Sequence, residues 1–278
     1  MAEGFRTAGI MGWPVGHSRS PMLHNHWLRR YGIAGAYVPF AVPPGRVADA
    51  VRGLPALGLA GCNVTVPHKE AVLAAIDLPD ALARRIGAVN LVVVQPDGSM
   101  TGTNTDAYGF MANLRATCPN WRAADGPAVV LGAGGSARAV VVSLLDAGAP
   151  EVRLLNRTEA RAESLAAELG GAIAVFGWEQ ARAALDGAAL LVNSTSLGMQ
   201  GQGPLDIDLA ALPRGAVVTD LVYVPLETPL LAAARARGNA VVDGLGMLLQ
   251  QAVPAFEAWF GVRPEVTAAL RAEVVASL

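Results

Sequence analysis

The sequence is poor in the residues that build disulfide frameworks and metal centres. Only two of its 278 residues are cysteines, Cys62 and Cys118, too few for a disulfide network or a cysteine-based metal cluster. Two thiols fit a reducing compartment, and the first residues lack the long apolar core of a secretory signal. We therefore expect a cytoplasmic protein without a metal site.

An excess of one charge and long apolar segments are also missing. Lysine and arginine number 21 and aspartate and glutamate 23, a net charge of −2 without runs of like charge. This argues against nucleic acid or an anionic membrane as partner. The longest uncharged stretch, Gly187–Leu205, contains many polar residues and does not resemble a membrane-spanning helix. With 53% hydrophobic residues, the composition predicts a folded globular protein.

Length and pattern together predict two α/β domains. The chain exceeds the usual domain size of about 100–200 residues, and short apolar runs alternate with helical stretches. Such alternation is typical of βαβ units and mostly parallel sheets. The strand-like runs are Ala8–Met11, Ala36–Phe40, Gly61–Val66, Asn90–Val94, Ala128–Leu131, Val152–Leu155, Leu190–Val192, Val217–Leu221 and Ala240–Val242.

Two helix starts can be placed from their first residues. Ser20 is suited to cap a helix whose first position is Pro21, because serine caps well and proline fits the first helical turn. Asn104, Thr105 and Asp106 stand directly before a helical pattern of apolar residues and predict the second start.

A glycine turn after residue 131 predicts a dinucleotide site. The apolar run Ala128–Leu131 leads into Gly132, Ala133, Gly134 and Gly135 and then a helical stretch. Gly132, Gly134 and Ala137 occupy the three small-residue positions of the Rossmann fingerprint, which serve a tight turn, close approach to a diphosphate, and helix packing. The diphosphate would lie at the positive helix N-terminus. A plain connecting turn is the alternative interpretation.

The residues after the next strand favour NADP over NAD. An NAD site usually has an acidic residue about 20 residues beyond the glycines, whereas this chain has Asn156, Arg157 and Thr158, with Arg161 one turn later. Cationic and hydroxyl donors suit a 2′-phosphate. The alternative is two solvated arginines at a helix start, although positive charge is unfavourable there.

Lys69 is the only lysine in the sequence. An ammonium group can lose a proton, which a guanidinium cannot, so Lys69 is a candidate acid and base in a chain whose other cations are arginine. Asp106 is the candidate carboxylate partner. The alternatives are a lone surface lysine for Lys69 and a helix cap for Asp106.

Nine motifs in order give the sequence a family resemblance. Polar residues gather in them at strand ends and helix starts, where open α/β sheets bind ligands. Together they resemble the shikimate dehydrogenase family. The motifs are Gly12–Asn25, Asn63–Lys69, Gly87–Asn90, Gly102–Asp106, Gly132–Gly135, Asn156–Thr158, Asn193–Met199, Asp220–Tyr223 and Asp243–Gln251.

The resemblance implies the fold and the reaction. It implies an N-terminal α/β substrate domain over residues 1–105, completed by C-terminal helices in 244–278, and a Rossmann-like NADP-binding domain over 106–243. The implied reaction is the reversible reduction of 3-dehydroshikimate to shikimate by NADPH, in the pathway to chorismate and the aromatic amino acids.

The resemblance also implies roles for individual residues. Lys69 would be the acid and base, paired with Asp106. The implied substrate contacts are Ser18, Ser20, Thr65, Asn90, Asp106, Tyr223 and Gln251. The implied cofactor contacts are Gly132, Ala133, Gly134 and Gly135 for the diphosphate, Asn156, Arg157, Thr158 and Arg161 for the adenosine phosphate, and Leu221 and Gly244 for the nicotinamide.

Two other functions stay open at this point. A quinate/shikimate or aminoshikimate dehydrogenase would share Lys69 and Asp106 but accept a different ring substituent, and an extra hydroxyl is hard for a pocket to reject. A non-catalytic protein that senses NADP(H) would need no proton donor, so the two residues argue against it. The expected partner is a small-molecule substrate. The sequence does not determine the oligomeric state, for which a homodimer is one candidate.

Overall fold

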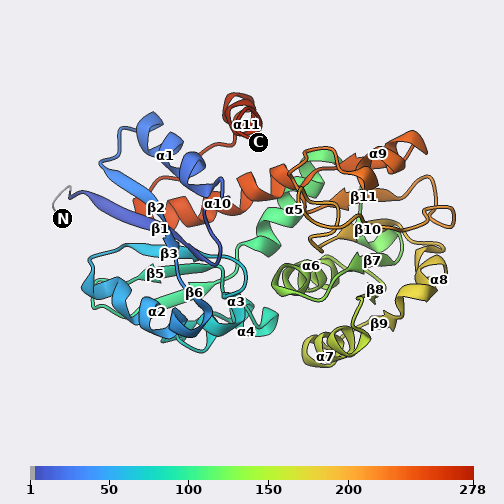
Figure 1. Cartoon of the computed structure of the whole chain (residues 1–278), viewed down its shortest axis with the longest axis horizontal. Coiled ribbons are helices and arrows are strands. Elements are labelled where there is room, and N and C mark those ends of the chain that lie inside the picture. The colour runs from blue at the N-terminus through green and yellow to red at the C-terminus, as the bar shows by residue number, and fades with distance from the viewer. Residues whose placement is uncertain (1–3) are drawn as a thin grey trace. The chain divides into compact units, whose positions relative to one another are not determined.

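The computed structural model describes residues 4–278 of the chain (Figure 1). The chain divides into two compact units. Unit 1 comprises Met1–Asp106 and Leu249–Ser277, and unit 2 comprises Ala107–Leu248. Each unit contains its own six-stranded sheet, so the predicted α/β class with two sheets is confirmed.

Unit 1 is built around a mixed sheet in the order β2-β1-β3-β5-β6-β4. Strand β1 is parallel to β2 and β3, and β4 is parallel to β6, while β5 runs antiparallel to both β3 and β6. The sheets are thus mostly parallel, as expected, and the exception is β5, which a short turn joins to β6. The strands are β1 (Arg6–Gly12), β2 (Gly35–Ala41), β3 (Gly61–Val64), β4 (Leu78–Pro79), β5 (Leu91–Val94) and β6 (Met100–Thr103).

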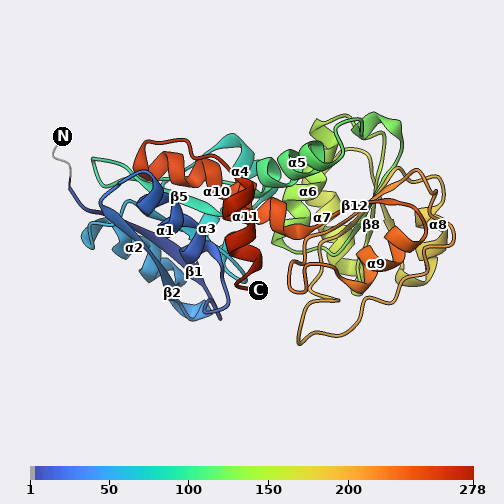
Figure 2. The same cartoon turned by 90° about the horizontal axis from the view of Figure 1, so that it is seen from above.

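The helices of unit 1 cover this sheet and include the C-terminal pair. One cluster of buried side chains joins α2 and α3 to strands β1, β3 and β5. Helix α11 lies beside α1 (Figure 2). The two helices are joined by His26, whose ring Nδ1 is 2.6 Å from the Glu273 carboxylate. The helices are α1 (Ser20–Arg30), α2 (Val47–Ala56), α3 (Lys69–Leu73), α4 (Ala81–Ile86), the C-terminal part of α10 (Gly244–Phe260) and α11 (Ala268–Val275).

Unit 2 contains a fully parallel sheet in the order β12-β11-β10-β7-β8-β9. Counted from β7 as the first strand, this is the 3-2-1-4-5-6 order of a Rossmann fold. The strands are β7 (Ala128–Leu131), β8 (Val152–Leu155), β9 (Ile173–Phe176), β10 (Leu190–Asn193), β11 (Val217–Asp220) and β12 (Ala240–Val242).

Helices cover both faces of the unit 2 sheet. Ala128 and Val130 of β7 belong to a buried cluster with α5, α6 and α7, whereas Val129 and Leu131 belong to another with α8 and α9. Two buried faces explain why these strands are apolar without alternation. The helices are α5 (Asp106–Thr117), α6 (Gly135–Asp146), α7 (Glu159–Leu169), α8 (Ala181–Leu185) and α9 (Pro229–Ala236). Short 3₁₀ turns lie at Ala123–Asp125 and Trp178–Gln180 in unit 2 and at Pro44–Arg46 in unit 1.

Candidate active site

Four strand ends bring the polar motifs of unit 1 to one edge of its sheet. Strands β1 and β3 are parallel, so the segments after them, which carry Ser18, Ser20 and Thr65, leave from the same edge. Because β5 is antiparallel to β3 and to β6, Asn90 precedes β5 at that edge. Asp106 follows β6 there as well. Residues more than 80 positions apart in the sequence therefore meet at one place.

Lys69 and Asp106 form a buried ion pair. Lys69 is the first residue of α3 and Asp106 the first residue of α5. The ammonium Nζ of Lys69 donates a hydrogen bond to Oδ2 of Asp106, and the two side chains are 11% and 8% exposed. A buried pair of opposite charges avoids the free-energy cost of an isolated buried charge. Lys69 is therefore not a surface lysine.

Asn90 fixes the second oxygen of the Asp106 carboxylate. Its Nδ2 donates to Oδ1 of Asp106 over 2.8 Å, while its own Oδ1 accepts from the amide of Thr105 over 2.7 Å. The side chain of Asn104 accepts from the Asp106 amide at 3.0 Å and so stabilises the start of α5. Both carboxylate oxygens of Asp106 accept side-chain donors, which is more than a helix cap requires.

Helix α1 begins one residue earlier than the sequence predicts. Its N-cap is Arg19, which makes no capping side-chain bond, and Ser20 is the first helical residue. The prediction that Ser20 caps this helix is therefore wrong. The hydroxyl of Ser18 instead accepts from the Ser20 amide at 3.3 Å, and the Ser20 side chain is buried.

Thr65 and Gln251 lie on two further segments of unit 1. Thr65 directly follows β3, and its amide donates to the carbonyl of Met11 in β1 over 2.8 Å. Gln251 reaches the site from α10, where its Oε1 lies 3.4 Å from the hydroxyl of Thr105. Helix α10 thereby contributes a polar group to the network around Asn90 and Asp106.

The sequence analysis assigned no role to two polar residues of this network. The hydroxyl of Tyr37 donates to Oδ1 of Asn63 over 2.7 Å, and Nδ2 of Asn63 donates to the carbonyl of Asn90 over 3.1 Å. Asn63 opens the Asn63–Lys69 motif and could have been found there. Tyr37 lies within an ordinary strand pattern and carries no signal in the sequence.

Unit 2 presents a glycine turn whose backbone is accessible. Gly132 has a φ of 105°, and a Cβ at this position would lie 2.8 Å from the hydroxyl of Ser194. Gly134 is the N-cap of α6, and a Cβ there would meet no atom within 4 Å. Gly135 begins the helix. The turn has the tight bend and the open helix start that a diphosphate needs.

The segment after β8 is polar and exposed. Asn156 bonds the carbonyl of Thr158 over 2.8 Å and so orders the turn before α7. Arg157 and Arg161 are exposed, and neither guanidinium group makes a hydrogen bond or ion pair with any of residues 4–278. Their guanidinium groups remain available to a ligand with negative charge.

Leu221 and Gly244 lie against each other in unit 2. A Cβ on Gly244 would stand 2.3 Å from the carbonyl oxygen of Leu221, so only glycine fits at this approach. Tyr223, two residues beyond Leu221, is half-buried in the loop after β11. As a residue of unit 2 it belongs to a different unit from the other proposed substrate contacts.

A buried carboxylate organises the strand ends beside Leu221. Asp220 accepts hydrogen bonds from Nδ2 of Asn193 at 2.9 Å, the amide of Val222 at 3.0 Å and the hydroxyl of Thr228 at 2.7 Å. Burial nevertheless raises the pKa of Asp220 above its ordinary value. The bonds connect the ends of β10 and β11 with the start of α9.

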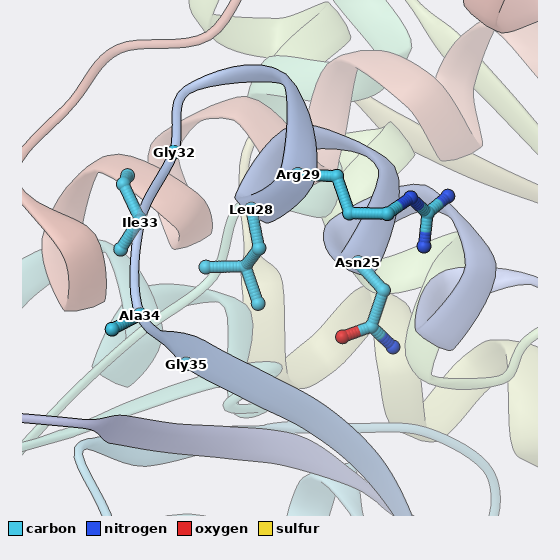
Figure 3. A pocket seen from close by; sticks show the side chains of 7 residues that line it. All are labelled: Asn25, Leu28, Arg29, Gly32, Ile33, Ala34 and Gly35. Carbon is cyan, nitrogen blue, oxygen red and sulfur yellow. The ribbon is translucent and has the colours of Figure 1, made fainter.

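Three further findings bear on other kinds of site. A pocket of about 460 Å³ between α1 and β2 contains none of the predicted site residues; it is lined by Asn25, Leu28, Arg29, Gly32, Ile33, Ala34 and Gly35 (Figure 3). Within residues 4–278, no three His, Cys, Asp or Glu side chains are grouped to bind a metal ion. In the same range no helix is long and apolar enough to cross a membrane.

Family models match three segments of the chain. The model described as shikimate dehydrogenase substrate binding domain matches residues 10–92. The model described as shikimate / quinate 5-dehydrogenase matches residues 118–199, and that of the shikimate 5'-dehydrogenase C-terminal domain matches residues 244–272.

Full-length relatives agree with these models. Shikimate dehydrogenase (NADP(+)) of Paramagnetospirillum magneticum is 62% identical over 97% of this chain and 98% of its own length. The shikimate dehydrogenase of Thermus thermophilus, solved with NADP(H) and shikimate, is 38% identical with a TM-score of 0.86 over 98% and 99% of the two chains. Quinate dehydrogenase from Corynebacterium glutamicum, solved with NAD, is 31% identical with a TM-score of 0.90 over 99% and 100%. The chain belongs to the shikimate dehydrogenase family.

Proposed function

We propose that this protein catalyses the reversible reduction of 3-dehydroshikimate to shikimate with NADPH, a step of chorismate and aromatic amino acid biosynthesis. The observation that carries the proposal is the buried Lys69–Asp106 pair with Asn90 on the second carboxylate oxygen. The names of the full-length relatives support the substrate and the cofactor. A protein that only senses NADP(H) would need no such pair.

In the proposed mechanism Lys69 moves the proton. Its ammonium has three donor hydrogens, of which one is directed to Asp106, so others remain for a substrate oxygen. During reduction Lys69 donates a proton to the oxygen that becomes the hydroxyl, and during oxidation it accepts that proton. Asp106 orients the amine and balances its charge in a largely buried site.

Substrate binding is assigned to unit 1 in this proposal. The segments that carry Ser18, Ser20, Thr65 and Asn90 leave from one edge of its sheet, and Gln251 joins them from α10. Hydroxyl and amide groups of this kind can bond the hydroxyls and carboxylate of shikimate. Tyr223 of unit 2 is the remaining proposed substrate contact. The proposed domains are 1–105 completed by 244–278 for the substrate and 106–243 for NADP.

The residues of unit 2 fit an NADP molecule. The bend at Gly132 and the open position at Gly134 suit a diphosphate, with Ala133 and Gly135 between and after them. Arg157 and Arg161 carry free charge for the 2′-phosphate, together with Asn156 and Thr158. The nicotinamide is assigned to Leu221 and Gly244, and when bound the reduced cofactor supplies the hydride.

The deciding experiment is a matrix of initial rates. Purified protein is assayed by nicotinamide absorbance with shikimate or quinate, each with NADP⁺ or NAD⁺. Turnover confined to shikimate and NADP⁺ is expected. Comparable rates with quinate or NAD⁺ would identify a broad-specificity enzyme, aminoshikimate is the next substrate to assay, and NADPH binding without any turnover would indicate a sensor.

Compartment and assembly complete the proposal. We place the protein in the cytoplasm, which is supported by the free thiols of Cys62 and Cys118. A homodimer is the proposed assembly. Light scattering of the purified protein separates a monomer of 28.6 kDa from a species of twice that mass.

A further inference from the structure

Tyr37 is a buried polar residue of unit 1 that the proposed mechanism does not use. It lies in β2, and its side chain is 1% exposed. Its amide donates to Oδ1 of Asn25 over 3.0 Å, and its carbonyl accepts from Nδ2 of the same side chain over 2.8 Å. Asn25 projects from α1 toward β2 (Figure 3). The backbone of Tyr37 is therefore bonded to a helix as well as to the sheet.

Aromatic contacts fix the plane of the Tyr37 ring. The His24 ring is stacked on it with centroids 4.1 Å apart and planes 6° apart, and the Trp259 ring lies 5.8 Å away. Both ring nitrogens of His24 are buried without a hydrogen-bond partner among residues 4–278. Burial lowers the pKa of His24 to about 3, so the stacked ring is neutral. His24 thus contributes packing and no charge.

The direction of each hydrogen bond from Tyr37 is determined by its partner. The carbonyl of Asn90 can only accept, so Asn63 must present its Nδ2 to that carbonyl and its Oδ1 to Tyr37. The Tyr37 hydroxyl must therefore donate to Asn63. Burial raises the pKa of Tyr37 well above its ordinary value, and a hydrogen bond from the Ser20 side chain opposes this only in part. The hydroxyl accordingly keeps the proton that it donates.

The same reasoning continues from Asn90 to the ion pair. The amide of Thr105 can only donate, so it determines that Asn90 presents Oδ1 to Thr105 and Nδ2 to Asp106. Asp106 then accepts from Asn90 on one oxygen and from Lys69 on the other. Each acceptor from Asn63 to Asp106 therefore has a defined donor, and the donor to Asn63 is the Tyr37 hydroxyl.

We propose that Tyr37 is a positioning residue for the Lys69–Asp106 pair, acting through Asn63 and Asn90. The inference rests on the proposed function, because it assigns Tyr37 a part in the same reaction. The hydroxyl fixes the rotamer of Asn63, and Asn63 fixes the backbone from which the Asn90 side chain projects. A misplacement of about 1 Å at the reacting groups is enough to slow an enzyme by up to about 100-fold.

The test is Tyr37→Phe, which removes one oxygen and keeps the stacked ring. We expect kcat for shikimate oxidation to fall about tenfold, with the KM for NADP⁺ unchanged. The solvent deuterium isotope effect on kcat should rise, because a misplaced acid and base makes proton transfer more rate-limiting. Loss of folded protein alone would lower the apparent kcat without changing the isotope effect.

The matched control is Tyr31→Phe. Tyr31 also lies in unit 1 near Phe256, but its hydroxyl accepts from the Glu265 amide at 3.2 Å and touches none of the network. The kcat and the solvent isotope effect of the Tyr31→Phe variant should equal those of the wild type. If the two variants behave alike while the wild type oxidises shikimate, the positioning role is wrong and the proposed function stands; an inactive wild type would instead refute the function.

A second variant keeps the proposal testable if Tyr37→Phe is unstable. Asn63→Asp retains an acceptor for Tyr37 but places an acceptor against the Asn90 carbonyl, which interrupts the chain of bonds at its next step. We expect the same rise in the isotope effect. An unchanged isotope effect in Asn63→Asp would contradict the proposal. Where Tyr37→Phe folds, adding it to Asn63→Asp should lower kcat little further. Fully multiplicative losses would show that Tyr37 acts independently of Asn63 and would overturn the proposal.

Discussion

The proposed sites in the two units are organised in opposite ways. In unit 1 the polar side chains bond one another: Lys69, Asp106 and Asn90 are buried and hydrogen-bonded before any substrate is bound. In unit 2 the residues assigned to the cofactor are backbone at Gly132 and Gly134 and the exposed side chain of Arg157. One site is pre-organised by its own bonds, and the other leaves its donors for a ligand.

This difference reflects what each site has to do. Proton transfer needs an acid and a base in one geometry, so bonds within the protein are useful there. Binding a charged cofactor gains most from donors that have no competing partner in the protein. Substitutions in unit 1 should therefore change kcat, whereas those in unit 2 should change cofactor affinity.

The largest effect is expected from Lys69→Met. Loss of the acid and base should lower kcat about 100- to 10,000-fold, while NADPH still binds in a fluorescence titration. Lys69→Arg is the matched control, since it supplies positive charge beside Asp106 but cannot release a proton at neutral pH. We expect Lys69→Arg to be better folded than Lys69→Met and similarly inactive. Activity in Lys69→Arg would contradict proton transfer by this residue.

The next largest effect is expected from Arg157→Ala. A charge-assisted hydrogen bond contributes about 1.5–3 kcal/mol, so the Kd for NADP⁺ should rise roughly 10- to 100-fold. The Kd for NAD⁺, which lacks the 2′-phosphate, should not change. Arg182→Ala, an exposed arginine elsewhere in unit 2, is the control in the same titration. An equal loss for NAD⁺ and NADP⁺ would mean that Arg157 does not distinguish the two cofactors.

Two glycines of the turn should separate stability from binding. Gly132→Ala places a side chain at a φ of 105° and 2.8 Å from Ser194, so unfolding free energy should fall by about 1–3 kcal/mol. A Cβ on Gly134 would meet no atom within 4 Å, so Gly134→Ala should change the unfolding free energy by less than about 0.5 kcal/mol. The same substitution should weaken NADP⁺ binding. Denaturant unfolding and cofactor titration measure both. Unimpaired binding in Gly134→Ala would remove the diphosphate from this position.

The smallest effect is expected from Asp220→Asn. Because the pKa of Asp220 is raised in the folded state, the protonated form stabilises the fold, and that stabilisation is lost as the pH rises through the raised value. The unfolding free energy of the wild type should therefore fall relative to the variant as the pH rises from about 4, and the difference should then level off. Urea unfolding across this range measures it. A difference independent of pH would contradict the raised pKa.

The sequence predicts the parallel parts of the fold better than the mixed part. Strands β7, β8 and β12 begin and end where their apolar runs do, since strands buried on both faces consist of such runs. Strand β4 is two residues long and β6 contains Gly102, so neither strand produces an apolar run that can be recognised in the sequence. The Pro96–Ser99 segment between β5 and β6 is a typical turn sequence and could have indicated the antiparallel pair.

A site residue can be predicted from the sequence when its type is unusual in the chain. It cannot be predicted when its role depends only on the residues that it contacts in the folded protein. Lys69 is conspicuous as the single lysine, and its pairing with Asp106 follows from chemistry. Tyr37 has a role only because folding places its hydroxyl 2.7 Å from Asn63, a contact between strands that no local pattern encodes. Cys62 illustrates the reverse: it stands beside the Asn63 motif, yet burial raises its pKa to about 12, so it is an unreactive thiol.

The solitary buried lysine has a practical consequence for covalent labelling. An amine-directed reagent meets one lysine side chain in the whole sequence, and its ammonium is bonded to a carboxylate in a largely closed environment. Acylation occurs at the neutral amine, so the labelling rate reports how often this pair separates and admits solvent. An adduct at Lys69, separated by peptide mass spectrometry from labelling of the N-terminal amine, would measure the opening of the site without any substrate being turned over.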